Sequence, residues 1–356
     1  MKKIYLLMIL ILIFELTCSN AGNQTHYLSH SRYTDPKEYG WMLDELPSDV
    51  TGICEIVKQQ IAHHNLLPYY NVPSSKGEKM PRGWPPVMTE LLKALKEIEP
   101  YNVYESRPVE QRIIGSCSVE SRFLAGLLRH KNIPARYRAG YFKNTMGNVE
   151  HIVRFWENVS RARGVERELM GEDPAAWKET MNAITMREQI EADKHIEHWI
   201  CEYWDNNEKR WRLLDANNTF LKASSGLDVS FHLPKKYYEF AYEAWMKMRS
   251  SEDFNPDQYQ EYPQDGRTHI KKSLLWDYYS LLNHDIGSDL SPQTSYEFTL
   301  KNYEELSKEE LEELDRLANL LSNDPTKEEL VTFYQNSKTL KIKSAEEDPY
   351  SFVFQK

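Results

Sequence analysis

The sequence predicts an α+β fold in which a buried helix packs on an antiparallel sheet and a mainly helical C-terminal region follows. Residues 116–130 carry apolar side chains on one stripe at helical spacing. Residues 135–142 then form a strand-like run. Alternating aromatic and β-branched residues over 198–204 and 210–215 flank a polar turn, which is typical of a hairpin. Beyond residue 236, helical patterns predominate.

The size and composition indicate a globular protein. The 356 residues are enough for about two domains at roughly 150 residues per domain. Hydrophobic residues make up 40% and charged residues 28%, which excludes a polytopic membrane protein, a collagen-like repeat and a disordered chain. The 44 Lys and Arg against 54 Asp and Glu give a formal net charge of -10. The basic surface that nucleic acids require is therefore missing, and we expect no nucleic-acid partner.

The N-terminus has the pattern of an export signal. Two lysines precede a continuous apolar run over residues 4–14, which is too short to span a bilayer but fits the core of a signal peptide. Cys18 follows and resembles the lipidated cysteine of a bacterial lipoprotein, although Glu15 stands where a strict signal has an aliphatic residue. Cleavage near Ala21 without lipidation stays open. We expect residues 1–18 to be a signal peptide and the only membrane contact to be a lipid on Cys18.

Composition also sets the expected domain organisation. Residues 19–47 are polar and aromatic without a period and are expected to be a tether and lead-in. A domain over 48–235 follows, with helices near 53–61 and 87–98. It includes an insertion at about 144–194, rich in Glu, Arg and Met, which we expect to form helices between two strands.

The C-terminal region, residues 236–356, is expected to be mainly helical. Its apolar spacing and two capping boxes predict four helices, namely over 237–249, over 268–283, after Ser307 with Glu310, and after Thr326 with Glu329.

Cys117 is the first candidate for chemistry. It follows Gly115 and Ser116 and begins the predicted helix. Unpaired backbone N–H groups and the positive end of the helix dipole favour a thiolate there, so we expect a lowered pKa. A free cysteine is more often a packed core residue, so Cys117 is a good candidate for a nucleophile only if a base and an acid lie close to it.

The predicted hairpin supplies a base and an acid. If Asn206 and Asn207 form a two-residue turn, the register places His198 directly opposite Asp215. Cross-strand partners have Cβ atoms about 4.5–5.5 Å apart, close enough for Asp215 to hold one imidazole nitrogen while the other faces Cys117. In the simpler alternative, His198 only begins a strand and Asp215 only caps its end.

In these residues the chain resembles the transglutaminase-like superfamily, whose members share a papain-like Cys-His-Asp triad in the order helix, strand, next strand. The resemblance covers about residues 107–219 and is carried by Gly115-Ser116-Cys117, Leu127-Leu128-Arg129, Ile133-Pro134-Ala135-Arg136, Arg138-Ala139-Gly140-Tyr141, Glu197-His198-Trp199-Ile200-Cys201-Glu202-Tyr203-Trp204 and Trp211-Arg212-Leu213-Leu214-Asp215-Ala216. It implies a papain-like core with Cys117 as nucleophile, His198 as general base and acid, and Asp215 as the residue that orients His198.

Two features depart from the pattern of that superfamily. Many relatives carry an Arg-Asp-type pair after the nucleophile, where this chain has Ser118-Val119-Glu120. The insertion at 144–194 is also longer than the usual strand connection. For the oxyanion, the backbone N–H of Cys117 is one expected donor. Gln111 lies six residues upstream, a separation that papain-like enzymes use for a side-chain donor, and is our candidate for the second.

A metal site is the competing interpretation of one part of the hairpin. His195, His198 and Cys201 would share a face of a helix and could then hold zinc. The run is instead β-branched and aromatic, and on a strand His198 and Cys201 point to opposite faces. We therefore expect no metal and no cofactor. Cys201 is expected in the core, and a disulfide to Cys54 is the alternative that an oxidising compartment leaves open.

The expected protein is an exported transglutaminase-like cysteine enzyme that attacks an amide or related acyl bond. Hydrolysis is favoured over cross-linking, because water is abundant outside the cell and nothing marks an amine site. Expected substrates are a peptide, a peptidoglycan stem or a glycopeptide, among which the sequence does not distinguish. The alternative from another class is a surface protein on the same fold that binds peptide or glycan without turning it over.

Overall fold

The computed structural model describes residues 24–67, 69, 70, 72, 79–83, 87–100, 102–143, 154, 194–259, 265–283, 298 and 301–340. The expected signal peptide with Cys18 lies outside the described residues, and so does the expected helical insertion, apart from Arg154 and Lys194. Among the described residues, every helix falls short of the length and apolarity that a membrane span requires.

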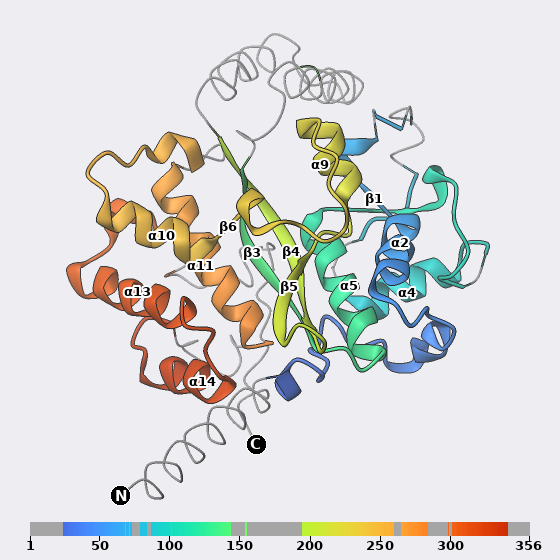
Figure 1. Cartoon of the computed structure of the whole chain (residues 1–356), viewed down its shortest axis with the longest axis horizontal. Coiled ribbons are helices and arrows are strands. Elements are labelled where there is room, and N and C mark those ends of the chain that lie inside the picture. Colours follow the sequence, from blue (N-terminus) through green and yellow to red (C-terminus); the bar gives the residue numbers. More distant parts are fainter. Residues whose placement is uncertain are drawn as a thin grey trace, which may run out of the picture.

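A four-stranded antiparallel sheet lies at the centre of the fold, in the order β5-β4-β3-β6 (Figure 1). The strands are β3 (Ala135–Lys143), β4 (His195–Asp205), β5 (Arg210–Leu214) and β6 (Tyr238–Phe240). The predicted α+β class is confirmed, and three of the strands were predicted. β6 is a strand where a helix was expected from residue 237, because three residues are too few to show a period.

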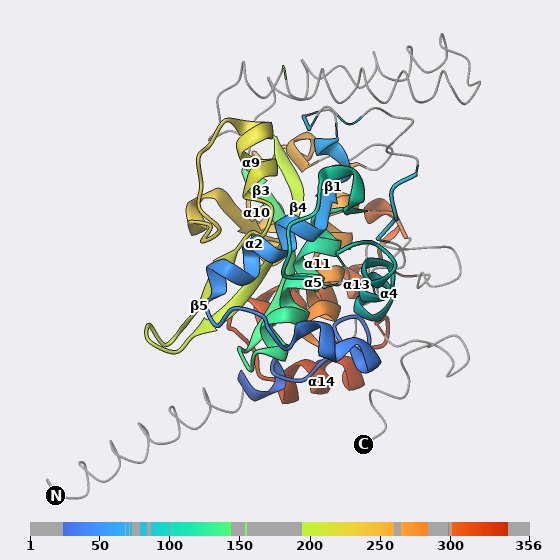
Figure 2. The same ribbon diagram turned by 90° about the vertical axis from the view of Figure 1, so that its right-hand side faces the viewer.

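The hairpin between β4 and β5 differs from the predicted register. Asp205 pairs with Arg210, so the turn contains four residues rather than two, and its last residue, Lys209, has a φ of 52°. The Asp205 carboxylate accepts the backbone N–H groups of Asn207 and Glu208 at 2.9 and 3.2 Å, which stabilises this wider turn. Figure 2 shows the turn projecting from the body of the molecule.

The helices from the first half of the chain lie on one side of the sheet (Figure 1), and they are α2 (Val50–Gln60), α4 (Met88–Lys96) and α5 (Cys117–His130). A parallel two-stranded sheet, β1 (Ile61–His63) with β2 (Ile113–Gly115), leads into α5. The apolar stripe predicted for α5 is buried, as shown by Val119, Phe123, Leu124, Leu127 and Leu128. This burial anchors the helix against β3 and β4.

The helices after β6 lie on the other side (Figure 1), and they are α10 (Ala241–Ser250), α11 (Gly266–Leu281), α13 (Lys308–Leu321) and α14 (Lys327–Asn336). Ser307 and Thr326 cap α13 and α14 in capping boxes with Glu310 and Glu329, as predicted. The remaining short elements are η1 (Lys37–Leu43), η2 (His64–Leu66), η3 (Val109–Gln111), α9 (Asn218–Ser225), η5 (Lys235–Tyr237), η6 (Pro256–Tyr259) and η7 (Tyr303–Glu305), where η denotes a 3-10 helix.

The segment expected to be a tether and lead-in, residues 19–47, packs against the core in the part that the structure describes. Tyr27 is fully buried, and its carbonyl accepts the backbone N–H of Ala135 at the start of β3. Its ring packs edge-on against Trp211 of β5 at 5.4 Å. Met42 and Leu43 of η1 are also buried in the main core. These long-range contacts, which local composition does not reveal, order the segment.

The elements that follow the expected boundary at 235 include one strand of the central sheet and a helix that lies against it. β6 belongs to the sheet although it follows this boundary, and α11 lies along the edge of β3 that β6 leaves unpaired. There Asp277 of α11 accepts the backbone N–H of Ala139 at 3.1 Å, and the Ser280 hydroxyl donates to the carbonyl of Tyr137 at 2.9 Å. A helix therefore covers this sheet edge, so the C-terminal helices complete the sheet.

Candidate active site

Cys117 is the first residue of α5, as predicted. Ser116 is the N-cap residue of α5 and has an extended backbone conformation. The strand β2, which pairs with β1, ends at Gly115 and leads directly into this cap. The hydroxyls of Ser116 and Ser118 lie 2.8 Å apart, and the Ser121 hydroxyl donates to the carbonyl of Cys117 at 2.7 Å. Cys117 is partly exposed, whereas most of the helix that follows it is buried.

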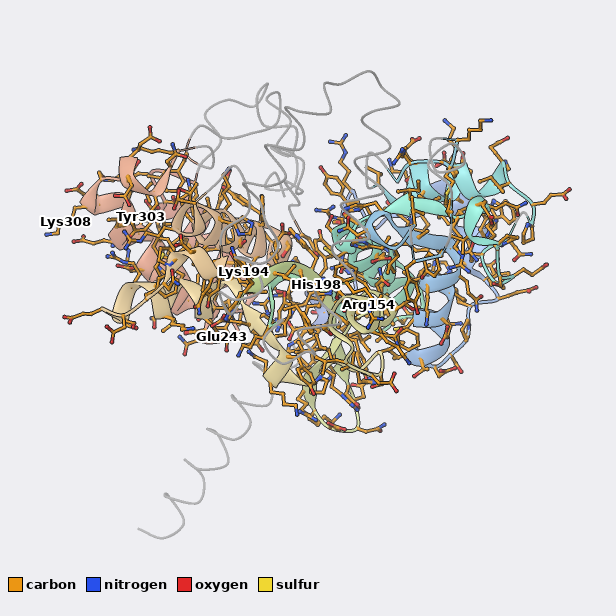
Figure 3. All side chains as sticks on the ribbon, turned by 90° about the horizontal axis from the view of Figure 1, so that it is seen from above. Arg154, Lys194, His198, Glu243, Tyr303 and Lys308 are labelled. Carbon is orange, nitrogen blue, oxygen red and sulfur yellow. The ribbon has the colours of Figure 1, made fainter. Side chains whose placement is uncertain are left out.

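His198 lies on β4, near the middle of the molecule and between the two groups of helices (Figure 3). Its Nε2 donates to the Oδ2 of Asp215 at 2.7 Å. The ring stacks on Phe220 with centroids 5.9 Å apart and planes 13° apart, and Phe142 packs edge-on at 6.3 Å. The imidazole and the carboxylate are only 1% and 3% exposed, so the pair is shielded from water.

The thiol of Cys117 completes the group. It lies beside the His198 imidazole, close enough for each group to shift the pKa of the other. Because Asp215 occupies Nε2, the nitrogen left for the thiol is Nδ1, which is buried and makes no hydrogen bond among the described residues. The structure thus brings Cys117, His198 and Asp215 together in the order that the sequence predicted.

The predicted pairing of His198 with Asp215 is correct in outcome but wrong in register. The wider turn shifts the pairing of β4 with β5 by two residues, so Asp215 no longer lies directly opposite His198. Side chains on a strand alternate between faces with a period of two, so a shift of two keeps both residues on one face. Diagonal neighbours remain within reach of long side chains. Asp215 is then fixed by two backbone contacts, its Oδ1 to the N–H of Asn217 and its own N–H to the carbonyl of Phe231, both 2.8 Å long.

The pKa of the Cys117 thiol and that of the His198 imidazole are both shifted, and the shift of Cys117 is opposite to the one expected. Burial raises the pKa of the Cys117 thiol, and the hydrogen bond from His198 only partly opposes this effect. The pKa is therefore raised where the helix start predicted a lowered value, because burying a thiolate is costly. For His198, burial acts to lower the pKa, but the Asp215 carboxylate raises it well above its usual range.

Two backbone N–H groups lie close to the Cys117 thiol. The N–H of Cys117 is at the start of α5, and the backbone N–H of Trp199 donates toward the thiol sulfur. β5 pairs with β4 only over Cys201–Asp205. The part of β4 before Cys201 is therefore not covered by β5, and α5 contacts it at Trp199. Sequence reasoning missed this donor, because the contact depends on where β5 ends.

Gln111 is not brought to the triad. It is exposed at the end of η3 and lines an open hollow with Glu99, Pro100, Asn102 and Glu105. β2 separates it from Cys117, and an extended strand of three residues spans roughly 10 Å. The expectation that its side chain donates to the oxyanion is therefore not supported by its position.

The metal site and the disulfide were the alternative interpretations of His195, His198 and Cys201. β4 is a strand, so His198 and Cys201 do not share a face, and His195 instead contacts Glu239 with Nδ1 2.7 Å from Oε2. Among the described residues, no group of three potential ligands could hold a metal ion. Cys54 and Cys201 are both buried free thiols, so this structure does not contain the alternative disulfide.

Several residues around the triad were missed from the sequence. The parallel pairing of β1 with β2 places His63 opposite Gly115, and the His64 ring nitrogen Nδ1 lies 3.2 Å from the Gly115 carbonyl. His63 also stacks on Phe220, 4.5 Å between centroids. Two adjacent histidines after an apolar helix were visible in the sequence, but only the strand pairing places them beside Gly115, two residues before Cys117.

Comparison of the chain with family models, curated proteins and solved structures finds no match in any of the three. The chemistry that this site can perform therefore follows from its own atoms. A thiol, an imidazole and a carboxylate joined in one line can move a proton away from sulfur and hold the resulting charge.

Proposed function

We propose that this protein is an exported transglutaminase-like cysteine enzyme that attacks an amide or related acyl bond. The observation that carries the proposal is the placement of the Cys117 thiol beside the imidazole of His198, whose Nε2 is held by the Oδ2 of Asp215 at 2.7 Å. A nucleophile, a base and an orienting acid within hydrogen-bonding reach are the requirements of covalent acyl transfer.

The reaction begins with general-base catalysis, because the raised pKa of Cys117 disfavours a preformed thiolate. Neutral His198 takes the thiol proton as sulfur forms a bond to the acyl carbon, and Asp215 stabilises the imidazolium. The N–H groups of Cys117 and Trp199 are the donors for the oxyanion. His198 returns its proton to the leaving amine as the C–N bond breaks. Water then adds to the thioester, releasing the acid and restoring the thiol.

The finer fold assignment is part of the same proposal. A helix with cysteine at its first position packs on an antiparallel sheet, with histidine on one strand and the acid just after the next. This arrangement supports a papain-like, transglutaminase-like core. The helices α10, α11, α13 and α14 then form an addition that closes the far side of the sheet.

Substrate and location are inferred from the sequence. We infer export through residues 1–18 and attachment by a lipid on Cys18. The substrates would be peptides, peptidoglycan stems or glycopeptides, with hydrolysis favoured over cross-linking. No cofactor is required by this mechanism, and the net charge of -10 disfavours nucleic acid.

A second candidate is a surface protein of this fold that binds peptide or glycan without turnover. The enclosure of the triad favours it, because His198 and Asp215 are only 1% and 3% exposed and burial raises the pKa of the thiol. In such a protein the three side chains would be retained for packing, and no acyl group would reach the sulfur.

Trapping the acyl-enzyme separates the two candidates. The full chain is mixed at mildly alkaline pH with a peptidoglycan digest and a peptide-amide library, quenched in acid and measured by intact mass. We expect an adduct that maps to Cys117, is absent in Cys117→Ala and persists in the matched variant Cys201→Ala, which removes a buried thiol outside the triad. His198→Ala should lower its formation by at least about 100-fold, within the range of general-base effects.

Failure to form any adduct, together with unchanged release of products in Cys117→Ala, would contradict the enzyme proposal. Saturable binding of the same peptides or glycans without an adduct would instead support the second candidate.

A further inference from the structure

Glu120 occupies the position at which this chain departs from the superfamily pattern. It lies one turn after Cys117 on α5 and is only 3% exposed. Its two carboxyl oxygens accept from the side-chain amide of Asn217, with Nδ2 at 2.9 and 3.0 Å. Asn217 is itself 4% exposed, so this contact between the nucleophile helix and the chain after β5 is buried.

Asn217 has two connections besides its role as a partner of Glu120, and the second leads on to His198. Its backbone N–H donates to the Oδ1 of Asp215 at 2.8 Å. Its side-chain Oδ1 accepts the backbone N–H of Phe220 at 3.0 Å and so caps α9. The ring of Phe220 stacks on His198. One asparagine therefore contacts both the acid of the triad and the helix that carries the ring over its base.

We propose that Glu120 is a positioning residue that, through Asn217, fixes Asp215 and Phe220 relative to the helix that carries Cys117. This proposal deepens the proposed function and rests on it. The Glu120–Asn217 contact is the described hydrogen bond that ties the nucleophile helix to the segment holding the acid. Without it, the imidazole would keep Asp215 as a partner but lose its fixed place relative to sulfur.

The charges around Glu120 indicate which carboxyl group holds a proton. Asp215, His198 and Tyr70 are the titratable groups that face it. Burial raises the pKa of Glu120 well above its usual range, and the Asp215 carboxylate raises it further. Glu120 therefore holds a proton more readily than an ordinary carboxylate, whereas the Asp215 oxygens accept hydrogen bonds from His198 and from the backbone of Asn217. Gln is therefore the conservative replacement at position 120.

The test follows the rate of Cys117 alkylation by iodoacetamide against pH in the full chain, which requires no substrate. Glu120→Gln should stay within about twofold of the wild type with an unshifted profile. Glu120→Ala should move the profile to higher pH and slow alkylation about tenfold at pH 8, because His198 no longer stabilises the thiolate. Glu313→Ala is the matched control, since Glu313 is also a buried helical carboxyl, 7% exposed, but lies on α13.

A double-mutant cycle separates positioning from a general loss of structure. In a His198→Ala background, Glu120→Ala should have no further effect on alkylation. An equal loss in both backgrounds, a wild-type profile for Glu120→Ala, or the same loss in Glu313→Ala would each overturn the proposal. Coupling between Glu120 and His198 without any acyl-enzyme in the trapping experiment would support the positioning role and count against the proposed enzyme.

Discussion

At the scale of single residues, burial sets the chemistry of Cys117. A helix start favours a thiolate, but burial beside the His198 ring costs more, and the pKa of the thiol is raised. Asp215 raises the pKa of His198 in turn, so the resting pair holds both protons at neutral pH. The active form appears only after the pair has lost one proton. We therefore expect reactivity to rise as the pH becomes alkaline.

At the scale of elements, the close contact of three strands fixes the base. Gly140 of β3 pairs with His198 on one side and with Phe240 on the other. The Tyr238 hydroxyl lies against it and donates to the carbonyl of His198 at 3.0 Å. Only a residue without a side chain allows β6 and Tyr238 to approach this closely.

Gly140→Ala should therefore destabilise the protein and disturb the triad together. A Cβ at this position would lie 2.4 Å from the Glu239 carbonyl oxygen and 2.6 Å from the Tyr238 hydroxyl. We expect a loss of roughly 2 kcal/mol or more in the free energy of unfolding, measured by urea denaturation. Gly40→Ala is the matched control, since its Cβ would have no neighbour closer than 4.0 Å. Equal free energies of unfolding for the two variants would show that β3 and β6 accommodate the added methyl group without loss of stability, which would contradict this prediction.

At the scale of the whole molecule, the C-terminal helices and the sheet form one structure. Arg138 of β3 makes two hydrogen bonds of 2.7 Å to the Asp277 carboxylate on α11, and a third of 2.8 Å to Glu202 on β4. All three side chains are buried. This network joins elements on both sides of the predicted boundary at 235.

Asp277→Ala should unfold the sheet and the helices at a lower denaturant concentration in a single transition. Removing one partner of a buried ion pair leaves an uncompensated charge and costs about 3–5 kcal/mol. Circular dichroism and tryptophan fluorescence should report the same midpoint. The control Asp228→Ala breaks an exposed pair with Lys222 and should leave the midpoint unchanged. Different midpoints for circular dichroism and tryptophan fluorescence would contradict the claim that the sheet and the C-terminal helices unfold as one unit.

Local signals predicted the elements that carry the site, whereas long-range contacts set what the sequence left undetermined. The start of α5 at Cys117 and the caps at Ser307 and Thr326 follow from neighbouring residues, and so were predicted. The burial of Tyr27 depends on a carbonyl contact with Ala135, more than a hundred positions away. The links that Asn217 makes to Glu120 and Asp215 likewise exist only once α5 and the hairpin have packed together.

The hairpin shows how an incorrect turn length can still predict the correct pair of site residues. The turn was predicted two residues too short, yet the parity of β4 and β5 was right, so His198 and Asp215 still meet. The raised pKa of Cys117 could not be predicted in this way, because burial depends on every element around the thiol.

The central claim is that Cys117, His198 and Asp215 act as one unit, and NMR titration of the His198 imidazole tests it most directly. In the wild-type chain the ring should remain protonated well above pH 6.5, the usual value for histidine. In Asp215→Asn the pKa should fall toward or below 6.5, because only the smaller contribution of Cys117 then opposes the effect of burial. In Cys117→Ala it should fall by less, since the thiol makes the smaller contribution. A His198 that titrates near pH 6.5 in the wild type and does not respond to either substitution would contradict the account.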